Sequence, residues 1–217
     1  MGSALAARRV LLYDSLARTM RTRDQPAEAL DAWQRKEGPT FLRSLGIHTG
    51  AHVIDFGCGP GGYVLPLASA VGRLGRVIAL DNNPQHLESV RRHIAGDPRR
   101  GVVEIHRTDG RLTLDGIDDA SLDTVLLFDV LQHIKDWATL FTSLRRVLKV
   151  GGLLLVNPSH LSHPGCVNVK DMRHRLAEHG FAFQRTKRGR VMHYDALRVE
   201  EIFVFRVSHR KPRPNPA

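Results

Sequence analysis

The chain has 217 residues, of which 42% are hydrophobic and 25% charged, and this ordinary globular composition excludes a largely disordered protein. The length fits one domain of about 100 to 200 residues with a modest extension. The formal net charge of +10 favours an anionic substrate or attraction to nucleic acid or anionic lipid, although high arginine use explains it equally well.

Two helices are predicted before the first strand. Residues 3–21 have the pattern of a basic amphipathic helix, and a second helix is expected over 26–45 with a break at Gly38-Pro39. We expect residues 1–48 to form a helical extension that packs over the ligand end of the domain as a lid. Plain structural packing is an equal alternative.

Strands and helices alternate from residue 52 onward. The predicted strands cover 52–56, 75–81, 102–106, 121–128 and 153–156. The second of them is short, continuously apolar and bounded by turn residues, which is the pattern of a buried parallel strand. The predicted helices between them cover 63–72, 83–96 and 136–149, the last ended by Gly151-Gly152. Asn83 with Pro84 and Asp136 are the expected N-caps of the last two helices.

The end of the chain is predicted to add an edge to the sheet. A helix over 169–179 is followed by strands over 181–185 and 200–208, read as an antiparallel pair joined by the basic stretch 187–198. The last residues, 210–217, are expected to be a disordered basic tail. The pattern is therefore α/β, a doubly wound sheet over 49–209, whose ligands bind at the carboxyl ends of the strands.

A glycine-rich turn follows the first strand, with four glycines in the six positions 57–62. Glycine permits positive φ and lets a ligand approach the backbone more closely than a Cβ would allow. The helix that follows directs unpaired N–H groups and its positive dipole end at the turn. A ligand with a carboxylate, a phosphate or a ribose is expected there.

Two ligand classes compete for this turn. Gly57, Gly59 and Gly62 satisfy the dinucleotide pattern G-x-G-x-x-G, and Asp81 follows about twenty residues later. Asp55 within the strand, where it can take part in binding an ammonium group, favours a different ligand. The G-x-G-x-G pattern made with Gly61 and the lack of a second domain for a dehydrogenase's substrate point the same way.

Five motifs in order resemble those of class I S-adenosylmethionine-dependent methyltransferases. They are the glycine motif 53–61, the acid-ended strand 77–81, Asp109-Gly110, the segment 126–133 and the segment 145–155. The resemblance covers residues from about 50 to 207 and implies a Rossmann-like seven-stranded sheet with the last strand antiparallel. Val150 departs from the proline common in relatives, which is expected to alter only the turn before the fifth strand.

The resemblance also implies which residues bind S-adenosylmethionine. The backbone of the glycine turn would contact the amino acid end of the cofactor, through Gly57, Cys58, Gly59 and Gly61, with Asp55 acting nearby. Asp81 would accept both ribose hydroxyls, because an ionised carboxylate is acceptor-only.

The rest of the cofactor would lie along the next strands. By the same resemblance, Asn82 borders the adenine, Asp109 accepts from the adenine amino group and Gly110 leaves space for the ring. The alternative for Asp109-Gly110 is a simple turn. Phe128 and Asp129 would line the methionine portion.

Histidine is the candidate catalytic residue. Methyl transfer is an in-line displacement that depends on alignment, and a base is needed only for a protonated acceptor. His133 is the best-placed base, with a role in shaping the pocket as the alternative. His160 and His163 rank second. They could imitate a metal cluster with Cys166, but one cysteine and loop spacing disfavour this, so no metal site is predicted.

A small-molecule acceptor, possibly anionic in view of the charge, is preferred. Nucleic acid is the alternative because of the basic residues Arg185, Lys187, Arg188 and Arg190. The segment after the fourth strand, however, lacks the Asn/Asp-Pro-Pro-aromatic motif by which base-amino methyltransferases resemble one another. RNA or protein acceptors and a non-catalytic cofactor-binding partner subunit remain open.

The targeting features favour a cytoplasmic protein. No apolar run approaches the roughly 18 residues of a membrane span, and the basic pair Arg8-Arg9 follows the small residues, unlike in a signal peptide. Cys58 lies inside the glycine turn, where a disulfide would distort the loop, so a reducing compartment is expected.

Overall fold

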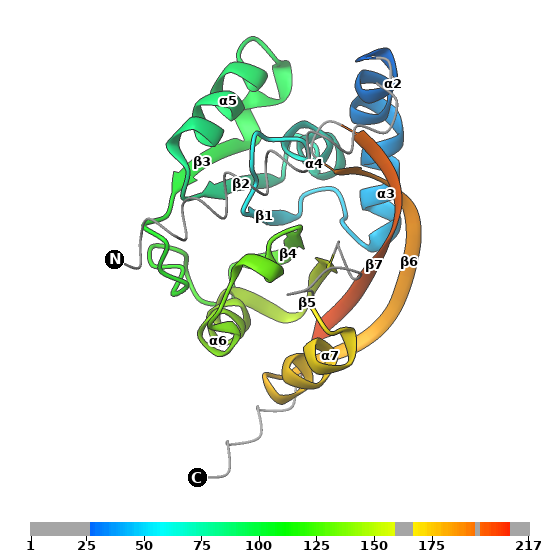
Figure 1. Cartoon of the computed structure of the whole chain (residues 1–217). Helices are drawn as coiled ribbons and strands as arrows, with labels where there is room; N and C mark the ends of the chain where they lie inside the picture. Colours follow the sequence, from blue (N-terminus) through cyan, green and yellow to red (C-terminus); the bar gives the residue numbers. More distant parts are fainter. Residues whose placement is uncertain (1–26, 159–166, 194–195, 209–217) are drawn as a thin grey trace, which may run out of the picture.

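A seven-stranded sheet forms the centre of the computed structural model, which describes residues 27–158, 167–193 and 196–208 (Figure 1). The strand order is β3-β2-β1-β4-β5-β7-β6. The strands are β1 (His52–Phe56), β2 (Arg76–Asp81), β3 (Val103–Arg107), β4 (Leu122–Phe128), β5 (Leu148–Asn157), β6 (Phe181–His193) and β7 (Ala196–Val207). The strands β1 to β5 pair in parallel, and β7 is antiparallel to both β5 and β6. The predicted Rossmann-like α/β fold with an antiparallel last strand is confirmed.

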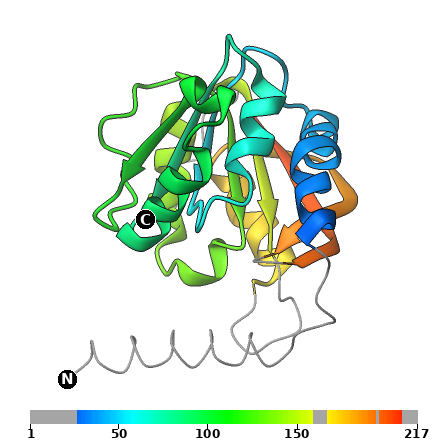
Figure 2. The ribbon, with the colours of Figure 1, turned by 90° about the horizontal axis from the view of Figure 1, so that it is seen from above.

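Helices cover both faces of the sheet, as Figures 1 and 2 show. Successive strand residues point to opposite faces. Val53 and Val77 therefore pack with α3 (Gly38–Leu45) and α4 (Val64–Val71), whereas Ile54 and Ile78 belong to the cluster under α6 (Trp137–Val147) and α7 (Val169–Glu178). The helical elements are α2 (Ala27–Ala32), η1 (Trp33–Glu37), α3 (Gly38–Leu45), α4 (Val64–Val71), α5 (Pro84–Ile94), η2 (Pro98–Val102), η3 (Leu131–His133), α6 (Trp137–Val147) and α7 (Val169–Glu178). The doubly wound arrangement leaves the carboxyl edge of β1, β2 and β4 for the loops.

The predicted break at Gly38-Pro39 is wrong. The chain stays helical there, because η1 is a π-helical turn in which the Gly38 N–H bonds to the Trp33 carbonyl oxygen. Pro39 has no N–H to donate and would clash with the carbonyl four residues back in a regular α-helix, and a wider turn relieves both problems. Trp33 is fully buried, and a Cβ on Gly38 would lie 3.0 Å from its ring. The predicted helix over 3–21 and the tail 210–217 lie outside the described residues.

The predicted connection over 187–198 is also wrong for most of its length, because it is strand. The strands β6 and β7 pair from Phe181 with Val207 to His193 with Ala196, with one register shift between Phe183 and Arg185. Figure 1 shows them as a long curved hairpin at one side of the molecule. Two positively charged residues of this strand region have partners on α3. Arg185 and Lys187 donate to carbonyl oxygens at the end of α3, which would otherwise lack partners.

The boundary between α6 and β5 lies earlier than predicted. The helix ends at Val147, and β5 begins at once, with Leu148 paired to Leu122 of β4. Lys149, predicted in the last helical turn, instead donates from Nζ to Asp123 Oδ1 at 2.7 Å. No helix among residues 27–158, 167–193 and 196–208 has the length and apolarity of a membrane span.

Candidate functional site

The glycine turn joins β1 to α4 and is fixed to the end of β2. The N–H groups of Gly57 and Cys58 donate to the Leu80 carbonyl oxygen at 2.8 and 3.0 Å. Gly57 has φ +72°, and a Cβ there would lie 2.6 Å from a methyl of Val130. Gly59 has φ +54°, but a Cβ there would meet no atom within 4 Å. The space above Gly59 is therefore open to a ligand.

Asp81 ends β2 beside this turn. Its Oδ2 accepts the N–H of Gly59 at 2.9 Å, its Oδ1 accepts the N–H of Asn83 at 2.8 Å, and His86 Nδ1 lies 3.4 Å from Oδ1. Burial works to raise the pKa of Asp81, but the hydrogen bonds from His86, Asn83 and Gly59 outweigh it and lower the pKa. The carboxylate is ionised, and each oxygen retains acceptor capacity for a ribose hydroxyl.

Asp55 lies in β1 beneath the turn and is 2% exposed. Burial first, and then the negative charge of Asp81, raise its pKa to about 7. Its Oδ2 is buried without a hydrogen-bond partner among the described residues, a state that costs free energy. A cationic group at this position would relieve both the repulsion and the missing contact. An ammonium group next to a ribose therefore fits the acids present.

The three residues predicted to lie near the adenine, Asn82, Asp109 and Gly110, are exposed at the surface. Asn82 is exposed, and Gly110 has φ +88° with open space where a Cβ would be. Asp109 is exposed and forms a turn, since Oδ1 accepts the Arg111 N–H at 2.9 Å while Oδ2 lies 3.1 Å from Arg111 Nε. The structure thus shows the turn that was the alternative for Asp109, and its exposed carboxylate remains accessible.

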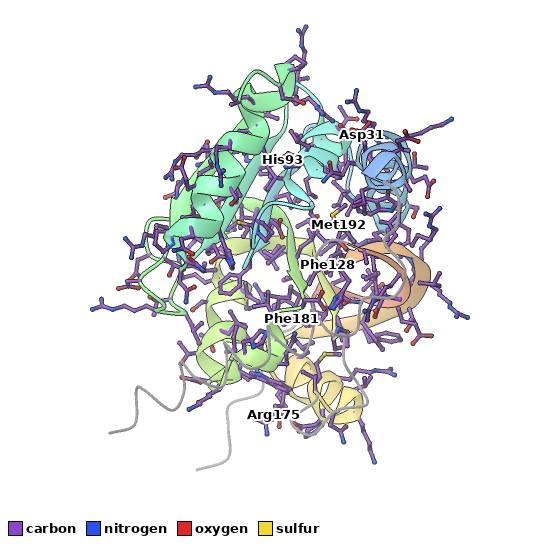
Figure 3. All side chains as sticks on the ribbon, turned by 45° about the horizontal axis from the view of Figure 1, so that its top comes forward. Asp31, His93, Phe128, Arg175, Phe181 and Met192 are labelled. Atoms are coloured by element: carbon purple, nitrogen blue, oxygen red, sulfur yellow. The ribbon has the colours of Figure 1, made fainter. Side chains whose placement is uncertain are left out.

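An aromatic group lines the side of the turn that faces β4. The ring of Tyr63, directly before α4, makes edge contacts with Phe128 at 5.0 Å and with Trp33 at 5.6 Å between centroids. Figure 3 shows Phe128 and Met192 in the interior, between the strands and the N-terminal helices. A Cβ on Gly62 would lie 2.8 Å from Met192 Sδ. The end of β6 therefore lies directly against the glycine turn.

His193, which the sequence analysis did not identify as a site residue, contacts Asp129, which it did. His193 Nδ1 lies 2.5 Å from Asp129 Oδ2, and the His193 side chain is 5% exposed. Asp129 has φ +57°, a conformation that aspartate tolerates better than most residues. The local signal for His193 was the apolar pair Val191-Met192, which interrupts the basic stretch and marks it as partly buried.

The chain is similar to known methyltransferases. The sequence model of the methyltransferase domain family matches residues 54–156. A ubiquinone biosynthesis O-methyltransferase of Methylocella silvestris is 35% identical over 106 residues, 48% of this chain and 38% of that protein. A demethylmenaquinone methyltransferase of Lactococcus lactis subsp. lactis is 27% identical over 135 residues, 62% of this chain and 51% of that protein.

The fold has solved counterparts as well. The crystal structure of an S-adenosylmethionine-dependent methyltransferase from Aquifex aeolicus superposes with a TM-score of 0.65 at 16% identity, covering 85% of this chain and 94% of that chain. This is a class I S-adenosylmethionine-dependent methyltransferase domain. The chain spans about half the length, or less, of the two curated relatives. S-adenosylmethionine is the cofactor of such domains, and the acids and open glycine turn described above fit it.

The predicted base, His133, is exposed to solvent. His133 ends the short helix η3 and is exposed, and no described residue forms a hydrogen bond with its side chain. His160, His163 and Cys166 lie outside the described residues. Within those residues there is no group of three side chains arranged to bind a metal ion.

Three of the four cations predicted to favour nucleic acid contact other residues of the protein. Arg185 and Lys187 contact the end of α3, and Arg190 pairs with Glu37 at 3.1 Å. Arg188 is opposite Glu201 in the hairpin register. These contacts weaken the case for a basic nucleic-acid surface along β6.

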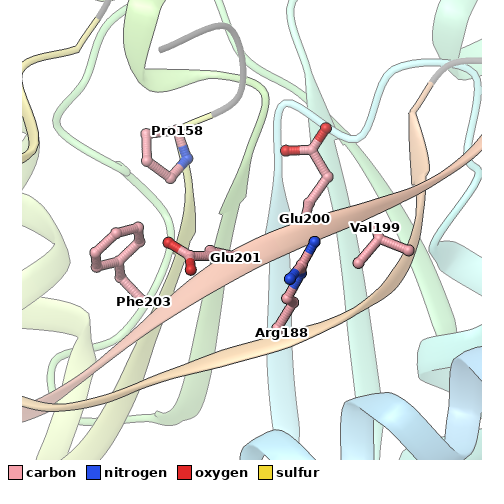
Figure 4. Close-up of a pocket in the computed structure, with 6 residues that line it drawn as sticks. All are labelled: Pro158, Arg188, Val199, Glu200, Glu201 and Phe203. Carbon is pink, nitrogen blue, oxygen red and sulfur yellow. The ribbon is translucent and has the colours of Figure 1, made fainter.

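A hollow of about 400 Å³ lies beside the hairpin, where Pro158 follows β5 (Figure 4). Arg188 shares it with two carboxylates, and the full lining is Pro158, Arg188, Val199, Glu200, Glu201 and Phe203. No predicted cofactor residue lines this hollow.

Proposed function

We propose that this protein transfers a methyl group from S-adenosylmethionine to a small organic acceptor. The observation that carries the proposal is the position of Asp81 at the end of β2, where it accepts the Gly59 N–H at 2.9 Å. One contact thus joins the glycine turn to the acid that would bind the ribose. The cofactor supplies an electrophilic methyl group on a sulfonium, and the protein's task is to hold the acceptor in line with it.

The cofactor-binding residues are assigned on the same basis. Asp55 would neutralise the cofactor's ammonium group, and Gly57, Cys58, Gly59 and Gly61 would contact its amino acid end. Asp81 would bind the ribose, with Asn82, Asp109 and Gly110 near the adenine. Phe128 and Asp129 would border the methionine portion. The unpartnered Asp55 Oδ2 and the open space above Gly59 support this assignment.

The acceptor class follows from the relatives and from the aromatic group. The relatives are named for demethylmenaquinone and ubiquinone biosynthesis, both of which concern a ring compound. The rings of Tyr63 and Phe128 and the side chain of Met192 offer an apolar surface beside the glycine turn. We therefore infer a hydroxylated aromatic or quinol acceptor. His133, predicted as the base, would need this acceptor to reach the exposed end of η3.

The cofactor assignment is tested by calorimetry with S-adenosylmethionine and S-adenosylhomocysteine. Asp81→Asn is expected to weaken binding at least about tenfold, because the ribose hydroxyls lose a charged acceptor. Asp31→Asn is the matched control, since Asp31 lies on the outer helix surface and pairs only with Arg35 among the described residues (Figure 3). Unchanged affinity in Asp81→Asn would contradict the assignment.

The activity itself is tested by mass spectrometry of a panel of acceptors incubated with the protein and S-adenosylmethionine. The panel includes phenols, catechols, quinols, amines, thiols and a structured RNA. Transfer to hydroxylated rings is expected. Transfer only to RNA would favour the nucleic-acid alternative, and cofactor binding without transfer to any acceptor would favour a non-catalytic subunit.

A further inference from the structure

Two buried acids lie on neighbouring strands beneath the glycine turn. Asp55 is opposite Ala79 in the register of β1 with β2, and Asp81 follows Ala79 by two positions, so both acids belong to the same face of the sheet. Asp55 is 2% exposed and Asp81 is 7% exposed. Two carboxylates that share a buried site repel each other, and the repulsion favours a proton on one of them.

The hydrogen-bond donors at this site decide which acid keeps its charge. Asp81 accepts the N–H groups of Gly59 and Asn83, and His86 Nδ1 lies 3.4 Å from its Oδ1. Hydrogen bonds to a carboxylate stabilise its ionised form. Asp81 is therefore the acid that stays charged.

Asp55 receives no comparable donor from the described residues, and its Oδ2 is buried without a partner. The neighbouring N–H groups of Gly57 and Cys58 donate instead to the Leu80 carbonyl oxygen. The Tyr63 hydroxyl donates to a carbonyl oxygen at the end of β6. A buried carboxyl group without a partner takes up a proton more readily than it bears an uncompensated charge.

No cation among the described residues forms an ion pair with Asp55. Burial first, and then the charge of Asp81, raise the pKa of Asp55 to about 7, in agreement with the hydrogen-bond pattern. The other titratable groups that act on Asp55 or share a neighbour with it come from the turn, from β2, from the segment after β4 and from β7. They are Asp81, Cys58, Tyr63, Asp129 and Glu200, with His86 against Asp81 and His193 against Asp129.

We propose that Asp55 carries a proton in the ligand-free protein and releases it when the cofactor's ammonium group binds. This inference rests on the proposed function and adds a proton to its binding step. The ammonium group keeps its own protons and its charge. Asp55 becomes the carboxylate that pairs with it, and the released proton passes to solvent, so charge and atoms balance.

The affinity for the cofactor should therefore rise with pH. Below about pH 7 the ligand must displace a proton, so the affinity is expected to approach a tenfold gain for each pH unit and to level off above about pH 7. The α-amino group of the ligand ordinarily loses its own proton only near pH 8. The window from about pH 5.5 to 7 thus reports on the protein.

Titration calorimetry of the full-length protein with S-adenosylhomocysteine, which retains the ammonium group, measures the proton directly. At pH 6, in buffers that differ in ionisation enthalpy, the wild type is expected to release about 0.9 proton for each ligand bound. Asp55→Asn cannot ionise, so it should release none and should bind at least about tenfold more weakly than wild type near pH 7.5. Asp31→Asn, which changes an exposed acid, is the control and should release the same proton as wild type.

A second ligand gives a readout on the wild type that needs no variant. 5′-Methylthioadenosine keeps the ribose and the adenine but has no ammonium group. Its binding at pH 6 is expected to release no proton, and its affinity should stay constant over the same pH window. The comparison separates the position next to Asp55 from the rest of the cofactor site.

Other outcomes would overturn the inference. Equal proton release with both ligands, or release that persists in Asp55→Asn, would show that another group gives up the proton. A pH dependence that is lost in His86→Gln and kept in Asp55→Asn would assign it to His86. An affinity for S-adenosylhomocysteine that does not change with pH would show that Asp55 is already ionised before binding, and the proposed function would stand. Failure of the protein to bind either S-adenosylmethionine or S-adenosylhomocysteine would instead overturn the proposed function, and the inference with it.

Discussion

The hydroxyl of Tyr63 donates to the carbonyl oxygen of Met192 at 2.8 Å, across 129 positions of the sequence. This bond ties the start of α4, and with it the glycine turn, to the end of the β6–β7 hairpin. Burial foremost, and then the charges of Asp129 and Asp55, raise the pKa of Tyr63, so its hydroxyl remains a donor over the whole neutral range.

Removing this hydroxyl should loosen the hairpin end. In Tyr63→Phe the ring contacts with Trp33 and Phe128 stay, but a buried carbonyl loses its donor, which costs about 1–2 kcal/mol. Urea unfolding measures the loss, and faster amide hydrogen exchange at residues 191–193 should accompany it. A wild-type unfolding midpoint with unchanged exchange would show that the bond contributes nothing.

Asp55 should make the stability of the ligand-free protein depend on pH. Its folded pKa of about 7 lies above the unfolded value of 3.8, so its contribution is fully present below pH 3.8 and is lost as pH rises through about 7. Asp55→Asn removes this loss, so the variant should gain stability relative to wild type over that window, by at most about 4 kcal/mol. Chemical unfolding of both proteins at several pH values gives the difference, and parallel curves would contradict the prediction.

Gly59 should be needed for the ligand more than for the fold. Gly59→Ala imposes a left-handed conformation on alanine, which costs roughly 1–2 kcal/mol, yet the added methyl meets no protein atom within 4 Å. The methyl occupies the space assigned to the cofactor, so affinity for S-adenosylmethionine should fall at least about tenfold. Gly116→Ala is the matched control, since Gly116 also has positive φ and open surroundings. Equal affinities in the two variants would remove Gly59 from the site.

Position 189 should require glycine because the Phe41 ring leaves no space for a Cβ, and not because of its backbone angles. A Cβ on Gly189 would overlap the Phe41 ring, and Gly189 is not among the described glycines with positive φ. Gly189→Ala should therefore destabilise the protein by about 1–3 kcal/mol through overpacking between β6 and α3. The double variant Gly189→Ala/Phe41→Ala should show less than the sum of the two single losses in urea unfolding. Additive losses would show that the two positions are independent.

Much of the candidate cofactor site could be described from the sequence because its parts are local. The glycine turn, Asp55 and the strand that ends in Asp81 each lie within one strand–turn segment, where the residue pattern determines backbone conformation directly. The cap formed by Asn83 and Pro84 is of the same kind, and its Oδ1 accepts the Gln85 N–H as expected. The connection over 187–198 was misread because charged residues suggested a loop, whereas their partners lie on α3, far away in the sequence.

The sequence by itself thus determined the α/β fold, the glycine turn and the acids around it, because periodicity, caps and turn residues act over a few positions. Only the tertiary structure decided that His193 meets Asp129. The two residues are 64 positions apart, and no local pattern relates them. Their contact depends on the strand order, on the antiparallel course of β7 and on the length of the hairpin, which together bring the end of β6 back to the carboxyl edge of β4.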